Sequence, residues 1–96
     1  MTYVRITLMK PLAGREVEAA EVNRQLAKFY RGQSGCLSSD AIRATDGQGE
    51  IGRVSFWESE TAADAGAMAD RSMPLRSRLH LLIRRGHQDR SFHTEE

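Results

Sequence analysis

The N-terminal segment, residues 2–10 (TYVRITLMK), alternates with a period of two residues, and this alternation constrains the fold more than any other feature. Such alternation with β-branched side chains predicts a strand. One side of that strand is wholly apolar and must be covered: Val4, Ile6 and Leu8. The other side is mixed, which suits a sheet that lines a partly wet pocket, although a solvated rim is the alternative: Tyr3, Arg5, Thr7 and Met9.

Helical and extended patterns then follow one another along the chain. Residues 15–31 carry apolar side chains at spacings of three and four, which predicts an amphipathic helix. Residues 35–44 and 50–57 predict two strands, and the turn signal at 46–49 makes them an antiparallel hairpin. Gly52 marks either a bulge or a close approach of two backbones.

The remaining residues predict helices followed by a last strand. Ser59 is a suitable N-cap for an alanine-rich helix over 60–71. A second helical segment begins near Pro74 and ends at Gly86. The weak alternation of residues 87–94 predicts a final strand, which either completes its own sheet or crosses to a neighbouring subunit.

This order of elements predicts an α+β fold. It is the ferredoxin-like βαββαβ pattern, a four-stranded antiparallel sheet with helices on one face, in a single domain over residues 1–96. The other face would leave the apolar side of the first strand in water, together with Val54 and Phe56. At about 25 cal/mol per Å², covering such a face gains several kcal/mol, so we expect a homodimer that stacks its sheet faces.

Composition excludes several classes of protein. With 40% hydrophobic and 28% charged residues the chain is unlike a disordered one, and no stretch approaches the ~20 apolar residues of a membrane span. Arg5 interrupts the first apolar run, so we expect neither a signal peptide nor a membrane partner. The single cysteine, Cys36, excludes a disulfide within the chain and favours a cytoplasmic location. Arginines gather in residues 71–90 without interleaved aromatics or a nucleic-acid motif, so no nucleic-acid partner is expected.

Two short motifs support a family resemblance over residues 2–92. They are FYRGQSGCL at 29–37, at the end of the first helix, and FWES at 56–59, before the alanine-rich helix. With the order of elements, they resemble the antibiotic biosynthesis monooxygenase domain of the dimeric α/β barrel superfamily. The resemblance implies a homodimer whose sheets close into a barrel, with a cavity between helices and sheet in each subunit. It also implies oxidation of polycyclic or quinol substrates by molecular oxygen, without a metal or flavin cofactor.

Other members of that family degrade haem, and the resemblance can be tested residue by residue. Their functional Asn, Trp and His positions fall here on Thr7, Gly66 and Leu75. Without the histidine there is no axial ligand for iron, so we expect no haem cofactor.

His80 and Trp57 are the two candidates with distinctive chemistry. His80 lies beside the apolar stripe of the last helix and is the candidate catalytic base for a phenolic proton, the alternative being a surface position. Trp57 shares a face with Arg53 and can stack on an aromatic substrate, the alternative being a structural plug between strand and helix.

Charged and apolar side chains complete the candidate substrate-binding set. Arg5, Arg43 and Arg53 lie on strands, where a guanidinium can bind a carboxylate or enolate. Salt bridges to Asp40 or Glu50 are the alternative. The other candidate contacts are Thr7, Met68 and Leu79.

His87, Asp89 and His93 alternate along the last strand and would share one face. Two histidines and a carboxylate can bind a metal, but these spacings match no standard site. We therefore expect polar edge-strand decoration and no metal.

The leading hypothesis is a cofactor-independent monooxygenase that acts on a small aromatic, quinol or polyketide-like molecule. The first alternative is a non-catalytic dimeric barrel that binds a small apolar ligand. The second is a purely structural or partner-binding dimer. An open cavity between helices and sheet would favour the first two, because a filled interior leaves no room for a ligand.

Overall fold

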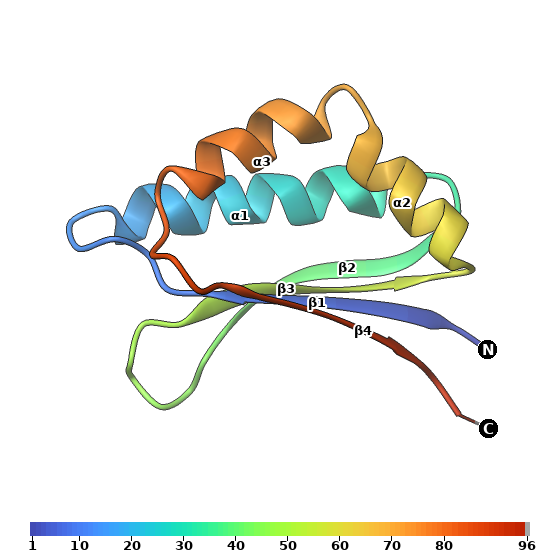
Figure 1. The fold of residues 1–96 in the computed structure, drawn as a ribbon, viewed down its shortest axis with the longest axis horizontal. Coiled ribbons are helices and arrows are strands. Elements are labelled where there is room, and N and C mark those ends of the chain that lie inside the picture. The colour runs from blue at the N-terminus through green and yellow to red at the C-terminus, as the bar shows by residue number, and fades with distance from the viewer. Residues whose placement is uncertain (96) are drawn as a thin grey trace.

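The computed structural model describes residues 1–95 and shows one sheet with every helix on the same face (Figure 1). The strands are ordered β2-β3-β1-β4, and all neighbours are antiparallel. This confirms the predicted ferredoxin-like α+β fold, and β4 completes its own sheet. The elements are β1 (Tyr3–Met9), α1 (Glu16–Arg31), β2 (Cys36–Arg43), β3 (Ile51–Trp57), α2 (Glu60–Met68), α3 (Ser72–His80) and β4 (Gln88–His93).

The face of the sheet opposite the helices is apolar along β1 and β3, as the alternation of β1 predicts, whereas the outer strands add polar residues to it: Ser38, Asp40, Gln88 and Arg90. Ile6 lies opposite Val54 and Val4 opposite Phe56, and directly opposite residues project from the same face of a sheet. The adjoining strands add two partly exposed side chains, Phe92 at 41% and Ile42 at 38% exposure. We call this surface the open face: Val4, Ile6, Leu8, Ile42, Val54, Phe56 and Phe92.

The core lies between α1 and the β3 side of the sheet. Val22 and Leu26 of α1 are fully buried, and Tyr30 meets Trp57 edge to face with 6.1 Å between ring centres. Acidic residues in the first turn and basic residues in the last turn of α1 suit its dipole. The amphipathic pattern of residues 15–31 therefore predicted both the helix and its buried side.

The helix α3 packs against α1 and α2 and leaves the β1–β4 half of the sheet uncovered beneath it. The middle of the helix-facing side of that half is polar, so little apolar area is available to hold a helix there. It is formed by Arg5, Thr7, Asp89 and Ser91, between the buried Tyr3 and Met9 at the two ends of β1. The space between α3 and these strands is the cleft described below.

The helix boundaries differ from those expected. The alanine-rich helix, α2, ends at Met68 rather than at residue 71, and α3 ends at His80 rather than Gly86. The chain after α3 instead bonds to the segment that follows β1: Leu12 N donates to Leu82 O (2.8 Å) and Arg84 N donates to Lys10 O (2.8 Å). These tertiary hydrogen bonds replace the helical ones.

Gly52 is a point of close backbone approach, one of the two expected alternatives. A Cβ at this position would collide with the carbonyl oxygen of Thr7 on the adjacent strand. The bulge of this sheet lies elsewhere, between Cys36 and Ser38 of β2.

Ser59 caps α2, as predicted: its hydroxyl accepts a hydrogen bond from Ala62 N at 3.1 Å. Ser59→Ala should therefore lower the free energy of unfolding by about 1 kcal/mol. Chemical denaturation measures the change, and Ser34→Ala in an exposed loop is the matched control. Equal stability of the two variants would contradict a stabilising cap.

Candidate functional site

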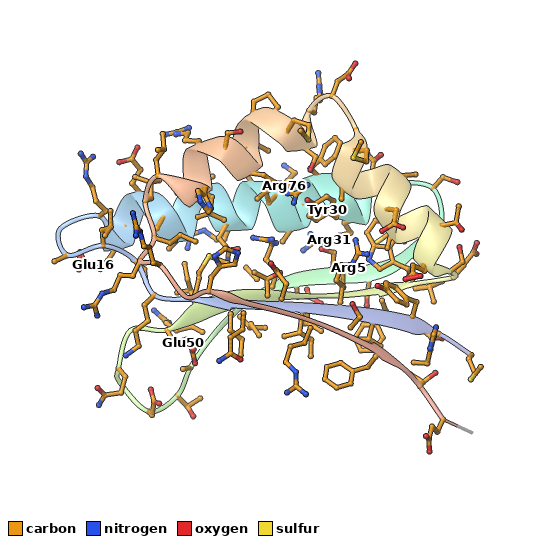
Figure 2. All side chains as sticks on the ribbon, viewed as in Figure 1. Arg5, Glu16, Tyr30, Arg31, Glu50 and Arg76 are labelled. Carbon is orange, nitrogen blue, oxygen red and sulfur yellow. The ribbon has the colours of Figure 1, made fainter. Side chains whose placement is uncertain are left out.

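Two cavities of about 540 Å³ and 280 Å³ meet beneath α3. The larger one we call the histidine cavity, because His80 and His87 line it, and the smaller one the aromatic cavity, because Tyr30 and Trp57 line it. Together they form the cleft, and Figure 2 shows Arg5, Tyr30 and Arg76 between the helices and the sheet. Four residues line both cavities: Thr7, Arg53, Arg76 and Asp89.

Trp57 forms a wall of the aromatic cavity and is itself packed firmly in place. Its Nε1 donates to Ser55 Oγ at 2.8 Å, and only 2% of its surface is exposed. Gly66 of α2 lies against the indole, where a Cβ would come within 2.6 Å of Cη2. Trp57 thus combines the predicted lining position with the structural role that was its alternative.

Arg53 reaches into the cleft from β3 and is held there by α1. Its Nη1 donates to Asn23 Oδ1 at 2.9 Å, and Asn23 Nδ2 donates to Gly52 O at 2.8 Å. Burial lowers the pKa of Arg53 and the charge of Arg76 lowers it further, whereas Tyr30 and Asp89 act in the opposite direction. The site therefore holds a guanidinium in a poorly hydrated position.

Arg5 is placed differently, because it has an acidic partner. Its Nη2 donates to Asp64 Oδ1 of α2 at 2.7 Å and to the Tyr3 hydroxyl at 3.1 Å. Burial disfavours its charge, but the hydrogen bonds to Asp64 and Tyr3 raise the pKa of Arg5 above its usual value. The salt-bridge alternative applies to Arg5, with Asp64 as the acid rather than Asp40 or Glu50.

A row of polar side chains in close contact borders the histidine cavity. Thr7 Oγ1 donates to Asp89 Oδ1 at 2.8 Å, and His87 Nε2 lies 3.2 Å from Asp89 Oδ2. The His80 ring stands perpendicular to His87 with 5.6 Å between ring centres. A carboxylate that holds one imidazole nitrogen fixes the ring and supports proton transfer at the other.

Of the three residues expected to share one face of the last strand, His87 and Asp89 line the cleft and His93 does not. His93 packs on Tyr3 with 5.5 Å between ring centres and does not line the cleft. Within residues 1–95 no group of three or more His, Cys, Asp or Glu side chains is placed to hold a metal ion.

Most of the predicted substrate contacts line the cleft. Met68 does not: it is 71% exposed, because α2 turns Ala63 and Gly66 inward and Met68 lies on its other side. Arg43 is also exposed and lies outside the cleft. The predicted residues that the structure brings together are Arg5, Thr7, Arg53, Trp57, Leu79 and His80.

Sequence reasoning missed three contributors to the cleft. Asn23 lies among the apolar positions of α1, and a polar residue at such a position was the available signal. Tyr30 lies within the predicted amphipathic helix, where it fits the apolar spacing, and its hydroxyl pairs with Ser72 Oγ at 2.8 Å. Arg76 had no local signal, because its position depends on how α3 stands above the sheet.

The sequence comparisons give one family. The family model described as "Antibiotic biosynthesis monooxygenase" matches residues 2–65 of the chain. No curated protein matches the chain at the sequence level.

Solved structures share the whole fold at low sequence identity. Rv0793 from Mycobacterium tuberculosis has a TM-score of 0.90 at 18% identity, covering 100% of this chain and 97% of its own. A conserved protein from Methanosarcina mazei has a TM-score of 0.91 at 9% identity, with coverage of 99% and 94%. SnoaB from Streptomyces nogalater, described as a cofactor-independent oxygenase, has a TM-score of 0.84 at 16% identity, with coverage of 99% and 94%.

The helices within residues 1–95 are all too short or too polar to span a lipid bilayer.

Proposed function

The chain belongs to the antibiotic biosynthesis monooxygenase family, and from this premise we propose that it is a cofactor-independent monooxygenase. Its substrate is a small aromatic, quinol or polyketide-like molecule, and its oxidant is molecular oxygen. The observation that carries the proposal is the His87–Asp89 pair on the wall of a 540 Å³ cavity. The structural similarity to SnoaB, a cofactor-independent oxygenase, agrees with it.

The reaction requires only a proton acceptor and a substrate that supplies all the electrons. A ring methylene made acidic by an adjacent carbonyl loses a proton and becomes an enolate. The enolate carbon reduces oxygen and forms a C–O bond; the O–O bond then breaks, and one oxygen atom leaves as water. The methylene becomes a carbonyl, so the four electrons taken up by oxygen come from that carbon.

His87 is the proposed base. Its link to Asp89 orients the imidazole, and Thr7 holds Asp89 in turn through the hydrogen bond described above. His80, the base expected from the sequence, is exposed and makes no hydrogen bond to a carboxylate among the described residues, so we place it in a secondary position. Asp89 is then a positioning residue, whereas His87 touches the substrate.

We further propose that the protein works as a homodimer joined through its open faces, in the cytoplasm. The apolar open face supports the dimer, because all of its side chains except the buried Val4 are partly exposed to water, which is unfavourable. The single cysteine supports a reducing compartment.

A non-catalytic protein that binds a small apolar ligand is the second candidate. Apolar side chains make up much of the histidine cavity, which is consistent with binding alone. They are Met9, Leu26, Met73, Leu79, Leu81 and Ile83. A purely structural role is disfavoured by the volume of the same cavity.

Oxygen uptake separates the first two candidates. Metal-free protein in the presence of a chelator should consume oxygen when it is given a panel of anthrones and quinols, at rates above those of the same substrates alone. Ser77→Trp should abolish the oxygen uptake above that of the substrates alone, because the larger side chain fills the histidine cavity from α3. Saturable binding of the panel with no excess uptake would reject the oxygenase and favour the binding protein.

A further inference from the structure

Arg53 and Arg76 stand on the shared wall of the two cavities, where the charge of Asp89 acts on Arg53 but no carboxylate lies within salt-bridge distance of either guanidinium among the described residues. Arg53 donates to the neutral amide of Asn23, and Arg76 Nη1 donates to the backbone oxygen of Ala67 at 3.1 Å. In the part of the chain that the structure describes, neither guanidinium forms a salt bridge.

The cleft therefore carries an excess of positive charge. Asp89 is the one acidic residue among the described residues that line the two cavities, and Thr7 and His87 already bind its carboxylate. Arg5, the third arginine of the lining, is matched by Asp64. The unmatched charge of Arg53 is poorly hydrated and therefore unfavourable until an anion joins it, whereas Arg76 is exposed and adds a second guanidinium to the same wall.

We propose that Arg53 and Arg76 bind a carboxylate on the substrate, so that the substrate class is an aromatic acid rather than a neutral quinol. A planar carboxylate accepts two parallel hydrogen bonds from a guanidinium, a geometry that a hydroxyl or carbonyl group does not match. The carboxylate at the shared wall directs the ring into the histidine cavity, beside His87. The position of the reacting carbon rests on the proposed function, whereas the anion site does not.

Binding of a matched pair of ligands tests the site without any turnover. The probes are 2-naphthoate and its neutral near-isostere 2-naphthamide, compared by isothermal titration calorimetry. We expect the carboxylate to bind at least about tenfold more tightly, because hydrogen bonds to a charged group are stronger than neutral ones. A carboxylate that fails to bind, or binds no more tightly than the amide, overturns the proposal.

Substitution of either arginine should remove the preference. Arg76→Gln and Arg53→Gln are each expected to weaken 2-naphthoate about tenfold and to leave 2-naphthamide nearly unchanged. Arg78→Gln is the control, because Arg78 lies on the same helix and pairs with Glu18 outside the cleft. Arg76 is exposed, so Arg76→Gln is expected to fold even if the buried Arg53→Gln does not, and thermal unfolding of each variant checks this. A preference that persists in folded Arg76→Gln overturns the proposal.

The two proposals fail in different ways. Tight binding of 2-naphthoate with no oxygen uptake from any aromatic acid would reject the oxygenase and keep the anion site. Equal rates of oxygen uptake with neutral quinols and with their carboxylated forms would support the oxygenase and reject the anion site.

Discussion

Ile6→Lys is expected to convert a dimer into a monomer and to weaken self-association by about 1000-fold. Ile6 lies in the middle of β1, opposite Val54 on one side and Arg90 on the other, near the centre of the open face. A second sheet stacked on this face would surround the new ammonium group mainly with apolar side chains. Its neighbour Arg90 carries a like charge, and the acidic residue in the same row, Asp40, lies two strands away beyond Val54. Sedimentation at micromolar concentrations measures the change as a halving of mass.

The control for this variant is Thr45→Lys, which adds the same charge in the exposed hairpin between β2 and β3. Thr45→Lys should sediment with the same mass as the wild-type protein. A wild-type protein that sediments as a monomer, or an Ile6→Lys protein that remains dimeric, would show that the open face is not the interface.

His87→Gln is expected to reduce turnover by about 100-fold or more, the usual contribution of a positioned base. Glutamine keeps much of the size of the side chain and its ability to hydrogen-bond Asp89, but it cannot accept a proton. Initial rates of oxygen uptake measure the loss.

Two further variants separate catalysis from positioning. Asp89→Asn should reduce turnover less than His87→Gln, because the imidazole is still present but less well oriented. His93→Gln, on the same strand but outside the cleft, is the control and should keep the wild-type rate. Equal turnover by His87→Gln and His93→Gln would remove His87 from the mechanism.

Local patterns were sufficient to predict the fold. The alternation of residues 2–10 predicted β1 and the apolar open face, and the spacing of apolar residues in 15–31 predicted α1 with its buried side. The predicted end of the last helix was wrong because Leu82 and Arg84 form backbone hydrogen bonds with Leu12 and Lys10 instead of helical ones. Such an exchange depends on contacts that no local pattern records.

The site was less predictable, because its key contacts join distant residues. Arg53 and Trp57 were found from their shared face on one strand. The Thr7–Asp89 hydrogen bond spans 82 positions, so Asp89 and His87 could be weighed only as a possible metal site. The position of Arg76 in the cleft could not be predicted from the sequence, because it depends on how α3 stands away from the sheet.

Labelling with ¹⁸O₂ shows whether the protein transfers an atom of molecular oxygen to its substrate. Protein, an aromatic acid or anthrone that is turned over, and ¹⁸O₂ in unlabelled water should yield a product that has gained one ¹⁸O atom, with the other atom recovered in water. Mass spectrometry of the product, quenched before its carbonyl exchanges with water, measures the gain. A product without ¹⁸O, accompanied by hydrogen peroxide, would contradict the monooxygenase account.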